Sequence, residues 1–147
     1  MIKQKTLKSM LGFTLMELLI AIAIVAILAA IAIPTYIHYT KKAYYSDVVQ
    51  AADRYKVAVA ACLDERNGTL GDCDGASYGI PADIAAGTGV GQVDSVTVVN
   101  SVITVTPRVS HGIIATDTYI LTPTYSSTAG ISWVASGGGC TNNLVSC

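Results

Sequence analysis

The chain has 147 residues, of which 52% are hydrophobic and 13% charged, and its formal net charge is −1. This is the length of about one domain. Outside residues 1–12, which carry three lysines, there are six basic and ten acidic side chains. That balance excludes a generally basic surface of the kind that binds nucleic acid through its phosphates. The charge of the chain therefore does not support DNA binding.

The first predicted element is an apolar helix near the N-terminus. All 21 residues from Phe13 to Ile33 are apolar except Thr14 and Glu17. A helix of that length spans about 31 Å, which is enough to cross a bilayer. An acidic side chain inside a bilayer costs about 2.5–3.5 kcal/mol, so such residues are normally paired and functional. The presence of Glu17 therefore requires a functional reason.

Two common kinds of N-terminal segment fit this region in part. A secretory signal would have the positive flank found here, and Ala30-Ile31-Ala32 matches a small-residue cleavage site. A plain signal anchor would also have this length, and the lysines on both sides only mildly favour a cytoplasmic N-terminus. Neither reading explains why Gly12 precedes the apolar run or why Glu17 lies inside it.

The sequence "GFTLMELL", residues 12–19, explains both. It resembles the processing motif of the type IV pilin family, in its type IVa subclass. The resemblance implies that residues 1–12 are a leader, that prepilin peptidase cleaves between Gly12 and Phe13, and that the same enzyme methylates the new N-terminus. In that family, the glutamate at the position of Glu17 faces the N-terminal amine of a neighbouring subunit. Cleavage would thus create the cation that the buried carboxylate needs, and the two would meet only on assembly.

The predicted helix continues beyond the apolar run. Residues 13–40 form its membrane-spanning and assembly half, in which Ala26 and Ala30 allow close approach of a second helix. Pro34 lacks a backbone donor and should bend or loosen the helix. The resemblance implies that helical order is lost in the stretch before this proline in filaments.

Residues 41–66 are predicted to be an amphipathic helix that starts a globular domain spanning residues 41–147. Apolar residues recur there at spacings of three and four, with charged residues between them, which is typical of a helix packed on a core. This predicted core stripe consists of Tyr45, Val48, Ala52, Tyr55, Val59 and Cys62. Asn67-Gly68 is a plausible stop.

The rest of the domain is predicted to be a loop followed by a sheet. Residues 67–91 are rich in glycine, aspartate and alanine and indicate a loop with little regular structure. Four segments with β character follow within residues 92–136, joined by short connections, the first of them at Asn100-Ser101. They predict an antiparallel four-stranded sheet that covers the helix stripe. Pro107 and Pro123 are expected at strand ends or edges.

Four cysteines form two close pairs in the sequence. Four cysteines allow three connectivities, but the short spacings favour Cys62–Cys73 and Cys140–Cys147. No spacing typical of a zinc site is present, so no metal site is predicted. Paired cysteines in a membrane-tethered chain indicate an oxidising compartment. The glycine run at residues 137–139 and the predicted C-terminal disulfide loop at residues 140–147 also resemble the disulfide-bounded C-terminal region of pilins.

Catalysis has no support in the sequence. No serine–histidine–acid arrangement and no phosphate-binding glycine loop beside a strand is evident, and His38 and His111 have no second ligand at metal spacing. We therefore expect no enzyme activity and no cofactor.

The pilin resemblance implies an α+β fold in which a long N-terminal helix packs on a four-stranded antiparallel sheet. It implies a structural subunit of a surface filament, for adhesion, twitching motility or DNA uptake. The expected partners are other copies of the chain, prepilin peptidase, the inner-membrane assembly machinery and the inner membrane. The subunit would span the inner membrane once, with its C-terminus in the periplasm, and then become extracellular. A type II secretion pseudopilin or minor pilin is the alternative, and a membrane-anchored periplasmic enzyme or binding module is a remote one.

Overall fold

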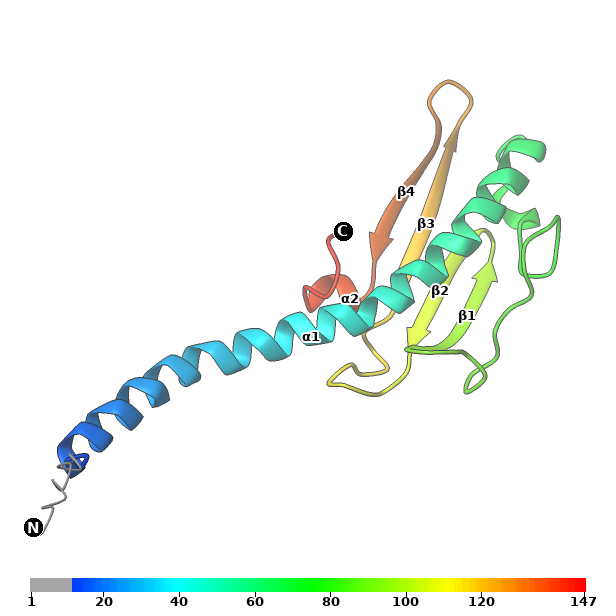
Figure 1. Cartoon of the computed structure of the whole chain (residues 1–147). Helices are drawn as coiled ribbons and strands as arrows, with labels where there is room; N and C mark the ends of the chain where they lie inside the picture. The colour runs from blue at the N-terminus through cyan, green and yellow to red at the C-terminus, as the bar shows by residue number, and fades with distance from the viewer. Residues whose placement is uncertain (1–11) are drawn as a thin grey trace, which may run out of the picture. The chain divides into compact units, whose positions relative to one another are not determined.

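The computed structural model describes residues 12–147, so residues 1–11 of the predicted leader lie outside the described range. The chain divides into two compact units between Ile37 and His38. Helix α1, Leu15–Glu65, runs through this boundary (Figure 1). The two units differ in what their part of the helix contacts, and each is described separately.

In the N-terminal unit, α1 has no buried residue. Its side chains are almost all apolar, so the helix is formed by local hydrogen bonds and good helix formers rather than by packing. Pro34 lies inside α1, which continues without a break on both sides. The hydroxyl of the following Thr35 donates to the carbonyl of Ile31 at 3.1 Å. The expected loosening at Pro34 is therefore not seen in the described single chain, and loss of helical order on assembly stays a prediction.

In the globular unit, α1 buries one face. All six members of the predicted core stripe are buried there, together with Leu63. The helix ends at Glu65, one residue before the predicted end, in a turn that satisfies its last carbonyls. Asn67 takes a left-handed conformation with φ 50°, and the N–H of Gly68 donates to the carbonyl of Leu63 at 2.8 Å. Asparagine tolerates this conformation, which explains why Asn67-Gly68 stops the helix.

Four strands form one antiparallel sheet in the order β1-β2-β3-β4. Their bounds are β1 Val93–Val99, β2 Val102–Pro107, β3 Tyr119–Ser126 and β4 Gly130–Ser136. Figure 1 shows the helix of this unit lying across one face of the sheet, and buried side chains from both form one core. Asn100 and Ser101 join β1 to β2 with φ 49° and 66°, the left-handed pair that a tight hairpin needs. The predicted α+β fold with a four-stranded antiparallel sheet is confirmed.

Pro123 lies at an edge of the sheet, one of the two kinds of position predicted for it. It is inside β3 and pairs with Trp133 of β4. The pairing of β2 with β3 extends only as far as Leu121. Pro123 is therefore tolerated because the side of β3 toward β2 carries no ladder at that point, where a missing N–H would break one.

The segment between helix and sheet is more ordered than predicted. It contains a short 3-10 helix, η1, Leu70–Asp72, and Ile84 forms an isolated bridge with Val96 of β1. The carboxylate of Asp83 also accepts a hydrogen bond from the N–H of Val98 at 2.9 Å. This segment thus covers the outer edge of β1, where unpaired backbone groups would otherwise invite another strand. The loop composition does not reveal this role, because the contacts are one short backbone bridge and one side-chain hydrogen bond.

Candidate assembly and processing site

Glu17 has a hydrogen-bond partner within its own chain. Its carboxylate accepts the backbone N–H of Thr14 at 2.9 Å and the hydroxyl of Thr14 at 2.7 Å. In return, the N–H of Glu17 approaches the Thr14 hydroxyl at 3.2 Å. This reciprocal arrangement is a capping box, which satisfies free donors at the start of a helix. Glu17 therefore has a hydrogen-bond partner in the monomer, whereas the sequence analysis expects it to meet a partner only on assembly.

The sequence contained a signal for this contact. A threonine followed three residues later by glutamate, directly before an apolar run, is the pattern of a capping box. An interpretation of Glu17 by a role between subunits alone overlooks Thr14 as its partner within the chain. The capping box does not include Gly12, so cleavage before Phe13 leaves both of its members in the mature chain.

The partners that Thr14 offers are neutral. A hydroxyl and one N–H satisfy part of a carboxylate, which has about four acceptor positions, but they do not neutralise its charge. Within the described residues of the N-terminal unit, no basic side chain follows Glu17 up to Ile37. A cation for Glu17 inside an apolar environment must therefore come from the chain terminus or from another molecule.

The peptide bond between Gly12 and Phe13 is accessible. Both residues precede α1 and are exposed, and the side chain of Phe13 is 87% exposed. A Cβ atom added to Gly12 would meet nothing within 4 Å. Contacts among the described residues therefore do not require glycine at this position.

The helix that follows presents apolar side chains on every side. Its large hydrophobic residues are all about half exposed or more: Leu15, Met16, Leu18, Leu19, Ile20, Ile22, Ile24, Val25, Ile27, Leu28, Ile31 and Ile33. Among the described residues, α1 is the helix long and apolar enough to cross a membrane by length and composition. A surface of this kind is not stable in water and must be covered by lipid or by protein.

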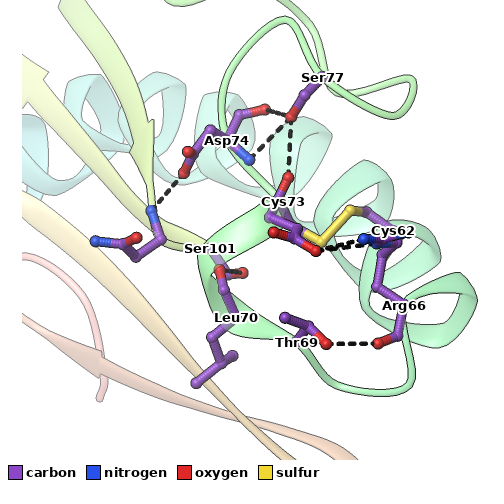
Figure 2. The surroundings of a disulfide bond; sticks show 10 residues. Cys62, Arg66, Thr69, Leu70, Cys73, Asp74, Ser77 and Ser101 are labelled. Atoms are coloured by element: carbon purple, nitrogen blue, oxygen red, sulfur yellow. Dashed lines mark hydrogen bonds and ion pairs between the residues drawn. A yellow bond between two sulfur atoms is a disulfide. The ribbon is translucent and has the colours of Figure 1, made fainter.

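Two disulfides are present in the globular unit. Cys62 is joined to Cys73 and Cys140 to Cys147, the same pairs that the short spacings favour. Figure 2 shows the first of these connecting the end of α1 to the segment after η1. Arg66, close to Cys62 in the sequence, donates to the carboxylate of Asp72 at 2.5 Å. Peptide mapping without reduction is the chemical test of both bonds.

Sequence reasoning missed one residue entirely, the fully buried Asp117. Burial by itself raises the pKa of this carboxyl group, but hydrogen bonds from the N–H of Ile114 and the side chains of Asn142 and Lys41 outweigh it and hold the pKa below its usual value. The backbone carbonyl of Asp117 also accepts the hydroxyl of Tyr45 at 2.8 Å. Asp117 is thus an ionised structural group whose partners come from distant parts of the chain.

No metal site is evident in the described part of the chain, where no three histidine, cysteine, aspartate or glutamate side chains gather. His111 is exposed, and its ring stacks on that of Tyr44 with 3.8 Å between centroids. Asp74, in the aspartate-rich loop, accepts the N–H of Asn100. These contacts account for the polar residues as structural groups.

Comparison with known proteins agrees with this geometry. The family model described as the prokaryotic N-terminal methylation motif matches residues 7–33. The chain is 37% identical over 122 residues to the prepilin peptidase-dependent protein D of Escherichia coli K12, covering 82% of this chain and 77% of that protein. The chain belongs to the type IV pilin family.

Two further relatives are named as pilus subunits. Over 93 residues the chain is 42% identical to the type IV major pilin protein PilE1 of Neisseria gonorrhoeae, covering 63% of this chain and 42% of that one. Over 75 residues it is 40% identical to the type IV pilus subunit protein TapA of Aeromonas hydrophila, covering 51% and 52%. The matched region thus spans about half of each of these two relatives.

Proposed function

We propose that this chain is a structural, non-enzymatic subunit that polymerises into a type IV pilus after cleavage between Gly12 and Phe13. Prepilin peptidase removes residues 1–12 and methylates the amine of Phe13. The observation that carries the proposal is the apolar helix without a buried residue, with one carboxylate, Glu17, one turn from the cleavage point. Such a helix needs lipid before assembly and other helices after it.

Before assembly, the helix is proposed to span the inner membrane. Its lysine-rich flank, residues 1–12, lies on the cytoplasmic side and the globular unit lies in the periplasm, where its disulfides form. In this state, the capping box with Thr14 provides hydrogen bonds to Glu17 near the membrane surface. The carboxylate is tolerated there without a counter-ion.

During assembly, the amine of Phe13 becomes the counter-ion. A new cation appears at the head of the mature helix, four residues before Glu17, and pairs with the carboxylate of a neighbouring subunit. An ion pair inside an apolar bundle is favourable only when its geometry is good, and a single unpaired charge there is strongly unfavourable. The pair would therefore select one register between neighbouring helices.

Two observations bear on the alternatives. The closing disulfide loop, Cys140–Cys147, favours a pilin over a type II secretion pseudopilin. A minor pilin is a second candidate, because the chain is 36% identical over 100 residues to a probable minor fimbrial protein of Dichelobacter nodosus. The abundance of the chain in sheared surface filaments distinguishes a major subunit from a minor one.

Processing is tested by mass spectrometry of the mature chain. We expect an N-terminus at Phe13 that carries one added methyl group, and a Gly12→Ala precursor that remains uncut. Gly71→Ala is the matched control, since its nearest contact is 3.8 Å away and it should be processed normally. A mature chain that begins at Ile33 would mean cleavage by an ordinary signal peptidase and would contradict the proposal.

A further inference from the structure

The cluster around Asp117 joins three separate segments of the globular unit. Asp117 belongs to the connection between β2 and β3, and its carboxylate lies 3.3 Å from the ammonium of Lys41 on α1. The side-chain amide of Asn142, in the C-terminal loop, donates to the other carboxylate oxygen at 2.5 Å. None of these contacts takes part in the proposed filament pairing.

Lys41 acts in this cluster as an internal counter-ion. Its side chain is 20% exposed, and it is the first charged residue after Glu17 in the sequence. The adjacent Lys42 is exposed and forms no ion pair among the described residues. A buried carboxylate without such a partner would be strongly destabilising. The two lysines therefore have different roles despite their adjacent positions.

The glycine run before Cys140 is shaped to fit the same cluster. A Cβ atom at Gly138 would lie 1.9 Å from the carbonyl oxygen of Thr116, and one at Gly139 would lie 1.8 Å from the hydroxyl of Tyr45. The N–H of Gly139 donates to the carbonyl of Thr118 at 3.1 Å. Only glycine allows the loop to approach residues 116–118 this closely.

The disulfide Cys140–Cys147 cannot make this attachment itself. Both of its cysteines lie within the C-terminal loop, residues 137–147, so the bond restricts the loop but does not join it to α1 or to the sheet. The disulfide Cys62–Cys73 differs, because it connects α1 to another segment. The groups that reach out of the C-terminal loop are the side chain of Asn142, the glycine backbone, the buried Leu144, and the partly buried Cys140 and Val145, which pack on the core.

We propose that Asp117 is the anchor that docks the C-terminal disulfide loop, residues 137–147, onto the globular unit, and that this docking does not require Cys140–Cys147. The disulfide keeps the loop compact, and the carboxylate holds it in place. The loop therefore keeps its position when its own disulfide is absent and leaves it when the anchor is lost. This inference does not depend on polymerisation.

Hydrogen exchange followed by mass spectrometry, on the full chain in detergent micelles, tests the anchor. The readout is the exchange rate of the amides in residues 137–147. We expect Asp117→Asn to raise this exchange rate roughly tenfold or more, since the charge is lost and an NH2 donor replaces one of the two oxygens that face the donors of Asn142, Ile114 and Lys41. The Cys140→Ser/Cys147→Ser double variant should stay within a few-fold of the parent chain.

Two matched comparisons keep the test decisive if Asp117→Asn fails to fold. Asn142→Ala removes only the loop side of the cluster and should also free the loop, while the amides of residues 45–60 stay protected. Lys41→Met should free it more than Lys42→Met does. The anchor is refuted if loss of the disulfide alone frees the loop, or if Leu144→Ala frees it while Asn142→Ala and Asp117→Asn do not.

Discussion

The two parts of helix α1 form the same backbone structure for different reasons. Between Tyr45 and Leu63 its apolar residues recur every three or four positions, and seven of its residues are buried in the globular unit. Between Leu15 and Ile33 apolar residues occupy every position but that of Glu17, and no side chain is buried. A helix with one apolar face finds its partner within its own chain, whereas a helix that is apolar all round needs one outside it. Within the single helix α1, residues 45–63 thus pack in the folded globular unit, whereas residues 15–33 need a partner outside the chain.

Glu17→Ala should have the largest effect, and only on assembly. The methylated amine of Phe13 would enter the apolar bundle unpaired, at a cost of about 3–5 kcal/mol per subunit. The globular unit should fold and form its disulfides as before. The ratio of sheared surface filament to membrane-held subunit, by blot and electron microscopy, measures the effect. Glu65→Ala, at the exposed end of the helix, is the control, and equal filament yields from the two variants would contradict the assigned role.

Leucine truncations in the two parts of α1 should give opposite results. Leu63 is fully buried, so Leu63→Ala should reduce the free energy of unfolding of the globular unit by about 2–5 kcal/mol. Leu28 is 63% exposed, so Leu28→Ala should leave that quantity unchanged and reduce filament yield instead. Denaturant titration of each variant in micelles, with a shearing assay, makes the comparison. A loss of unfolding free energy in Leu28→Ala would show that the first part of α1 contributes to folding.

Two adjacent tyrosines of α1, Tyr44 and Tyr45, should contribute unequally to the stability of the globular unit. Removal of the Tyr45 hydroxyl leaves the carbonyl of Asp117 without its donor, so Tyr45→Phe should lower the free energy of unfolding by about 1–3 kcal/mol. Tyr44→Phe keeps the ring that stacks on His111, so it should change the free energy of unfolding by less than about 0.5 kcal/mol. Thermal unfolding of both variants measures the difference. Equal losses would mean that the contact with Asp117 is not the important one.

The titration of Asp117 should leave the free energy of unfolding unchanged near neutral pH and reduce it in acid. Its pKa in the folded chain lies below the value of about 3.9 expected when unfolded. The unfolded chain therefore takes up a proton first as the pH falls. The stabilising contribution is complete above about pH 4 and is lost progressively as the pH falls through the folded pKa. Acid unfolding curves of the parent chain and Asp117→Asn should converge at low pH, and a constant difference would contradict this.

Much of the fold could be predicted because its signals are local. The core stripe follows from helical spacing, the strands from runs of β-branched residues, and the paired cysteines from their short separations. Asp117 could not be found in this way. A single aspartate between Thr116 and Thr118 resembles any solvated loop residue, and its partners Tyr45 and Asn142 are 72 and 25 residues away. Only the fold brings them together.

The candidate site was predicted in part for a related reason. Gly12, Phe13 and Glu17 lie within six consecutive residues, so their motif can be recognised without a structure. The capping box of Thr14 with Glu17 was equally local but was missed, because the carboxylate was assigned a partner in another molecule. The effect expected at Pro34 concerns the filament, and the structure describes a single subunit. Loss of helical order there therefore stays a prediction.

Cryo-electron microscopy of sheared filaments tests the central claim most directly, which is that the N-terminal half of α1 is an assembly surface registered by Glu17. We predict a helical filament whose interior contains residues 13–33, with the methylated amine of Phe13 within ion-pair distance of the Glu17 carboxylate of a neighbouring subunit. A filament in which this helix lies outside the core, or in which Glu17 contacts only its own Thr14, would contradict the account.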